Sequence, residues 1–160
     1  GCIVIFTPRD MGPHAWQGNE AKQRQIRRRF QLIGTTADTQ RVWDIRRAVQ
    51  VIRQVCRSLK TPPVIRGEQS LQELVLLATL FESVSGPQGL ADVTADPTTW
   101  PDILNLTRTI APQELVALVA FRNKISATPE SREITAFAEK LAKDARWRAA
   151  GTSPPVYPPR

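Results

Sequence analysis

Histidine, cysteine and serine are the residues of this chain with the chemistry for nucleophilic catalysis or metal binding. His14 is the only histidine, and the two cysteines are Cys2 and Cys56. These three residues do not have a metal-ligand spacing, and the chain has neither a Walker loop nor a Gly-x-Gly-x-x-Gly motif. A serine nucleophile needs a base within hydrogen-bond reach, normally a histidine. The sequence therefore predicts no metal and no cofactor, and it makes His14 a polar loop residue.

Two loop carboxylates and the cysteine pair leave alternatives open. Asp92 and Asp96 follow an apolar run, and the ends of strands are where α/β sheets bind ligands, although loop carboxylates are more often only solvated. Cys2 and Cys56 would be neighbours if a strand begins at the first and a returning helix ends at the second. A disulfide between them is one interpretation, and two free thiols in a core is the other.

The positive charge of the chain is concentrated in its first third. The formal net charge is +7 over 160 residues. The clustered arginines are Arg24, Arg27, Arg28, Arg29, Arg41, Arg46, Arg47, Arg53 and Arg57. Such a cluster can neutralise phosphates, but no zinc-finger spacing, helix-turn-helix or aromatic-interleaved strand accompanies it. The pattern favours a solvated basic face or a contact surface, disfavours nucleic acid, and leaves a polyanion-binding module as an alternative.

Helical periodicity is clearest between residues 39 and 57, where Val42, Ile45 and Val49 recur at spacings of three and four. Thr36 or Asp38 would cap this helix, and the following prolines would end it. Further helices are predicted at residues 70–81, 101–108, 112–121 and 133–148. Short apolar runs predict strands at residues 3–6, 64–66, 90–93 and 124–127.

Strands that alternate with helices predict an α/β fold, in which a mostly parallel sheet has helices on both faces as a three-layer structure. We assign residues 1–150 to one partial domain and residues 151–160 to a proline-rich tail. The strand-like start predicts that further sequence precedes this chain. No run approaches the roughly 18 uninterrupted apolar residues of a membrane span, so no membrane partner is expected, and the compartment, cytoplasmic or exported, stays open.

Three segments resemble the C-terminal half of bacterial α/β-hydrolase-fold proteins, of the acetyl-xylan-esterase-like and prolyl-oligopeptidase-like kind. Residues 6–12, Phe-Thr-Pro-Arg-Asp-Met-Gly, are similar to a strand and its Asp-x-Arg-Gly-x-Gly turn. Residues 34–48 are similar to the helix before the nucleophile strand. Residues 64–71 fall at the nucleophile elbow, where a strand turns into a helix.

The resemblance implies a serine hydrolase whose catalytic groups are missing. The nucleophile position of the elbow is occupied by Gln69, whose side chain cannot act as a nucleophile. Ser70, one residue later, is a residue type that is favoured as a helix cap. In the family the catalytic histidine follows the last strand, but no histidine follows Ser70 in this sequence. Glu130 lies at the position of the catalytic acid, where it has no histidine to orient. The resemblance implies a catalytically degenerate region.

Three functions follow from these observations. The first is a non-catalytic, hydrolase-like region with a structural or binding role in a longer protein, with the upstream half or another subunit as its partner. The second is an esterase or peptidase whose missing triad members lie outside this chain. The third is a basic module that binds a polyanion. No small-molecule ligand is identified by the sequence.

Overall fold

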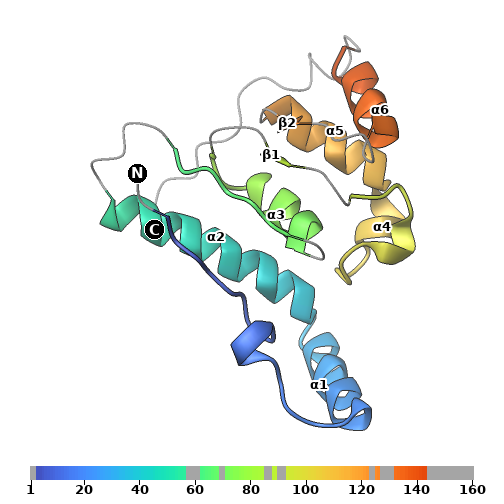
Figure 1. The fold of residues 1–160 in the computed structure, drawn as a ribbon. Coiled ribbons are helices and arrows are strands. Elements are labelled where there is room, and N and C mark those ends of the chain that lie inside the picture. Colours follow the sequence, from blue (N-terminus) through green and yellow to red (C-terminus); the bar gives the residue numbers. More distant parts are fainter. Residues whose placement is uncertain are drawn as a thin grey trace.

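The chain is built mainly from helices (Figure 1). The computed structural model describes residues 3–56, 62–68, 71–84, 88–89, 93–122, 125–126 and 132–143. The helices in chain order are η1 (Gly12–His14), α1 (Glu20–Leu32), α2 (Ala37–Val55), α3 (Gln72–Thr79), η3 (Pro97–Thr99), α4 (Leu106–Thr109), α5 (Pro112–Arg122) and α6 (Arg132–Lys143). The strands are β1 (Gln88–Gly89) and β2 (Ile125–Ser126). The proline-rich tail that the sequence predicts lies outside the described residues.

The predicted α/β three-layer fold is wrong. Within the described residues the only paired strands are β1 and β2, which have two residues each and run parallel. Residues 3–6 and 64–66 are extended but have no partner strand, and residues 90–92 lie outside the described part. An apolar run forms a strand only where a neighbouring strand supplies ladder hydrogen bonds, and here the neighbours are helices. The hydrolase-like sheet is thus not formed by the part of the chain described.

The predicted helix at residues 39–57 is confirmed as α2. Its apolar stripe, Val42, Ile45 and Val49, is buried. The hydroxyl of Thr36 accepts a hydrogen bond from the Thr39 amide at 3.1 Å, so Thr36 is the cap. The predicted end is close to the observed one, since α2 ends at Val55.

The core is centred on α3, which lies between α2 and α5, while α6 packs on α5 (Figure 1). Every residue of α3 is buried, as expected of a short helix that is apolar on nearly all sides. The helices predicted at residues 70–81, 112–121 and 133–148 correspond to α3, α5 and α6, although residues 144–148 lie outside the described part. The helix predicted at residues 101–108 is confirmed only in its last turn, because α4 begins at Leu106 and residues 101–105 are not helical.

Arginines of α2 join it to the end of α3. The carboxylate of Glu82 is buried, and it accepts hydrogen bonds from Arg46 Nε at 3.1 Å and from Gln50 Nε2 at 2.8 Å. Arg53 Nη1 lies 3.8 Å from the same carboxylate, and the Arg46 guanidinium stands 4.7 Å from the Phe81 ring centroid. These arginines therefore hold the fold together and do not form the solvated basic face that the sequence favoured.

Candidate docking surface

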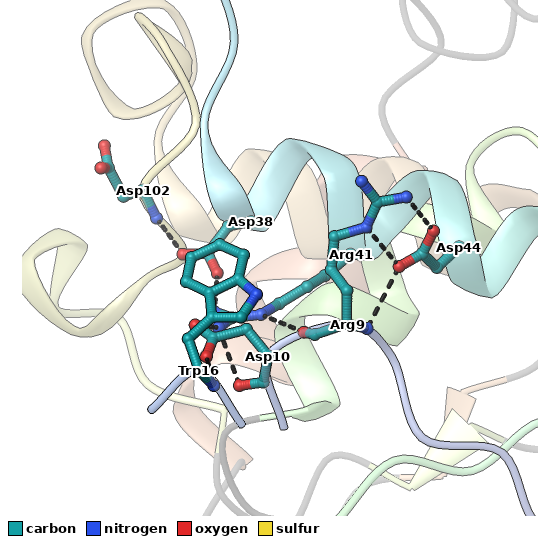
Figure 2. A network of polar contacts seen from close by, with 7 residues as sticks. All are labelled: Arg9, Asp10, Trp16, Asp38, Arg41, Asp44 and Asp102. Atoms are coloured by element: carbon teal, nitrogen blue, oxygen red, sulfur yellow. Dashed lines mark hydrogen bonds and ion pairs between the residues drawn. The ribbon is translucent and has the colours of Figure 1, made fainter. Parts of the chain in front are cut away.

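The N-terminal segment is fastened to α2 by a bidentate ion pair (Figure 2). Arg9 donates from Nε to Asp44 Oδ2 at 2.7 Å and from Nη2 to Asp44 Oδ1 at 2.6 Å. The Arg9 backbone amide also donates to Asp44 Oδ2, at 3.2 Å. Paired guanidinium and carboxylate groups in this fork geometry fix orientation as well as position. Asp44 therefore determines where the segment before Arg9 emerges from α2.

Arg41 makes the second attachment, one helical turn before Asp44. Its Nη2 donates to Asp10 Oδ2 at 2.8 Å and its Nη1 to Asp38 Oδ1 at 2.5 Å. Asp10 has a positive φ of 57°, a conformation that aspartate tolerates better than most residues, and its other oxygen accepts from the Trp16 amide at 2.7 Å. The remaining oxygen of Asp38 accepts from the Asp102 amide at 2.7 Å, so the network reaches the loop before α4 (Figure 2).

The ion pair between Arg9 and Asp44 favours the charged form of both groups. Burial alone would raise the pKa of Asp44, but the hydrogen bonds and positive charge of Arg9 outweigh it and hold that pKa below its ordinary value. The hydrogen bond with Asp44 in turn raises the pKa of Arg9. Both groups are therefore ionised over the physiological range, which keeps the attachment intact.

Four consecutive apolar side chains before this anchor are exposed. The exposed fractions are 91% for Ile3, 54% for Val4, 92% for Ile5 and 44% for Phe6. The sequence prediction of a strand buried on both faces is therefore wrong in this structure. Residues 3–8 run as an extended segment past α2 (Figure 1).

The exposed apolar area continues onto α2. Val51 and Val55 are 53% and 77% exposed. They follow Asp44 by seven and eleven residues, which places all three within about 20° of one line along the helix. They lie on the side of α2 to which the segment is attached. We call the six residues Ile3, Val4, Ile5, Phe6, Val51 and Val55 the docking surface.

A second exposed feature is the basic helix α1. It has no buried residue, and its contact with the segment before it is a stack of Phe30 on Trp16 with ring centroids 5.6 Å apart. Arg24 pairs with Glu20 at 2.7 Å. Arg27, Arg28 and Arg29 are exposed and form no ion pair with any described residue.

The predicted elbow and its partners are not assembled into a site by the described residues. Gln69 and Ser70 lie outside them, as do Glu130 and Asp92. His14 is exposed in η1. Asp96 caps η3, because its Oδ1 accepts from the amide and the hydroxyl of Thr98, and these bonds lower its pKa. Its carboxylate therefore has a structural role.

The flanks of the elbow are described and are tightly packed. A Cβ on Gly67 would lie 2.7 Å from the Leu71 carbonyl oxygen, and the Leu71 amide donates to the Glu68 carbonyl at 3.1 Å. The close approach of residue 67 to the backbone of Leu71 therefore requires a residue without a side chain. Cys56 is a free thiol, while Cys2 lies outside the described residues.

Neither a metal cluster nor a membrane-spanning helix is found among the described residues. They contain no cluster of three or more histidine, cysteine, aspartate or glutamate side chains suited to a metal ion. Within the same residues, no helix has both the length and the apolar character for crossing a bilayer.

The anchor residues were not singled out by sequence. Asp38, Arg41 and Asp44 follow one another at spacings of three, which puts them along one side of α2, and an Arg9-Asp10 pair of complementary charge precedes them. This spacing is the feature of the sequence that indicates the anchor. Comparisons with protein families, with curated proteins and with solved structures find no match to this chain.

Proposed function

We propose that this chain is a non-catalytic binding module that docks onto another polypeptide through the docking surface. The observation that carries the proposal is the nearly full exposure of Ile3 and Ile5 in a segment that is attached to α2 at Arg9. A contiguous exposed apolar patch is the usual mark of an interaction site. Fully burying an isoleucine side chain is worth about 1.5–3 kcal/mol, so these residues alone would supply much of a micromolar interface.

The anchor supports docking over accidental exposure. An unattached apolar segment would lose conformational freedom on binding, at a cost of about 1–2 kcal/mol for each residue ordered. Because the bidentate pair between Arg9 and Asp44 already restricts the segment, part of its conformational entropy is lost before the partner binds. A preorganised apolar segment on a helix is a competent binding element.

Selection from a displayed library of random peptides tests this function. The wild-type chain is expected to enrich apolar peptides that bind it, and Ile3→Asp/Ile5→Asp is expected to weaken their binding at least about tenfold. The matched control is Leu32→Asp/Ile33→Asp, which makes the same change at residues that are 84% and 75% exposed elsewhere. Failure to enrich any peptide, or equal losses of peptide affinity in the two double variants, would contradict the proposal.

A second candidate function, polyanion binding, is favoured by the unpaired arginines of α1. Successive residues of a helix are about 100° apart, so Arg27, Arg28 and Arg29 cover about 200° of the helix surface. Charges so distributed, which form no ion pair with any described residue, are available to phosphates or sulfates.

Heparin binding at increasing salt concentration tests this second function. Arg27→Gln/Arg28→Gln/Arg29→Gln is expected to lower the slope of log affinity against log salt, because up to three counterion-releasing contacts are removed. Arg47→Gln/Arg66→Gln/Arg108→Gln removes the same charge from three other exposed arginines and is the control. If both triple variants lose affinity equally, net charge alone explains the binding and α1 has no special part in it.

A further inference from the structure

The backbone of residues 3–8 has hydrogen-bonding capacity that the fold does not use. These residues are extended, and no backbone hydrogen bond joins them to any other described residue. Unpaired amide and carbonyl groups in an extended, apolar stretch form a ready template for a pairing strand. A docking helix would cover the side chains but would leave these groups without protein partners, because its own backbone groups are already bonded.

The exposure of the side chains alternates as it does along a strand. Ile3 and Ile5 are 91% and 92% exposed, whereas Val4 and Phe6 between them are 54% and 44% exposed. Successive side chains of a strand point to opposite faces, so one face is partly covered and the other is open. The β-branched composition of the stretch also favours the extended conformation over a helix.

The stretch has a defined end. Pro8 is buried and carries no amide hydrogen, so it terminates any ladder that runs along the segment. Arg9 follows immediately and is held by Asp44. Among the described residues, a partner strand can therefore pair along residues 3–7, and Pro8 sets the C-terminal limit of that pairing.

Charge distinguishes between a second copy of this chain and a different partner. The chain carries a formal net charge of +7, and like charges oppose association of two copies. The arginines of the anchor are already paired with Asp10, Asp38 and Asp44, so the attraction for acidic groups comes from the net charge of the whole chain. An edge strand with apolar side chains and flanking acidic residues complements the exposed apolar segment and this net positive charge.

From these observations we infer that the docking surface takes a β-strand from another protein, which adds along residues 3–7 by backbone hydrogen bonds and brings acidic residues beside its apolar ones. The inference rests on the proposed docking function, since it names the partner of that same surface. It goes beyond that function because it specifies backbone pairing.

The probe is a synthetic peptide of alternating valine and threonine with glutamate at each end. Hydrogen exchange measured by mass spectrometry on the full chain should show amides of residues 3–7 slowed at least about tenfold at saturating peptide. The key control is the same peptide N-methylated at every residue, which keeps its side chains and loses the hydrogen-bond donors of both edges. The methylated peptide is expected to give no protection, and Ile3→Asp/Ile5→Asp is expected to abolish the protection given by the unmodified one.

Each other result overturns the inference in a distinguishable way. Equal protection by the methylated peptide would mean that apolar contact alone suffices, so strand pairing would be wrong while the docking function survived. No protection by either peptide, with library peptides still bound at the docking surface, would exclude a strand as the partner. No peptide bound at that surface would remove the docking function itself. Sedimentation showing a dimer with residues 3–7 protected before peptide is added would assign the surface to a second copy.

Discussion

Apolar side chains are exposed in the N-terminal segment of the chain and buried in the helices α3 and α5. In α3 and α5, side chains such as Leu76, Val116 and Val119 are at most 2% exposed. In the segment before Arg9, Ile3 and Ile5 are more than 90% exposed although they are just as apolar. The apolar side chains of α3 and α5 are buried where helices pack against one another. The N-terminal segment is instead attached by ion pairs, and its apolar side chains stay exposed to solvent. Position in the fold, and not residue type, determines which apolar residues stabilise this protein.

The largest expected effect separates these two regions directly. Leu76→Ala should lower the free energy of unfolding by about 2–5 kcal/mol, because it removes buried methyl groups and leaves a cavity. Ile5→Ala should change it by no more than about 0.5 kcal/mol, since that side chain already faces solvent. Urea denaturation followed by circular dichroism measures both. Comparable losses of unfolding free energy would show that residues 3–6 belong to the core, as α3 does.

A smaller effect is expected at the anchor. Asp44→Ala should cost about 1–2 kcal/mol of unfolding free energy, because charged hydrogen bonds from Arg9 are lost in a partly buried place. Asp102→Ala is the control, since Asp102 joins the network through its backbone amide and is exposed. It should change the same free energy by no more than about 0.5 kcal/mol. An Asp44 variant as stable as the Asp102 control would contradict the anchor.

The pH dependence of the anchor follows from the lowered pKa of Asp44. A carboxylate whose folded pKa is depressed stabilises the fold fully above its unfolded value of about 3.9 and loses that contribution as pH falls through the folded value. The stability difference between wild type and Asp44→Ala should therefore be constant from about pH 5 to 8 and shrink below about pH 4. A difference that shrank as pH rose would have the wrong sign for this pair.

How much of the fold was predictable depended on the type of pattern. Periodic stretches of a dozen residues or more, such as the one through Val42 and Ile45, predict α2 correctly, because many residues repeat one signal. The runs at residues 3–6 and 64–66 are too short for that. Whether a four-residue apolar run becomes a strand is decided by distant neighbours, and local sequence contains no information about them.

The candidate surface was harder to predict than the fold. The resemblance points to Gln69 and Ser70 at the elbow position, and these residues are outside the described part. The sequence pattern places Arg41 in the basic cluster, for which it favours a solvated face or a contact surface, and it does not single out Asp44. Their pairing with residues more than thirty positions earlier is a long-range contact. Spacing in sequence indicates a shared face, but it does not name the partner.

The smallest expected effect concerns the arginines of the two N-terminal helices. Arg28→Gln should leave unfolding free energy within about 0.5 kcal/mol of wild type, since its charge is exposed and has no described partner. Arg41→Gln should cost about 1–2 kcal/mol, because it leaves Asp10 and Asp38 without their shared cation. Thermal and urea denaturation of the two variants in low salt provide the measurement. Equal stability of the two would mean that the network around Arg41 contributes no more than a surface ion pair, and the N-terminal segment would then need another explanation for its fixed position.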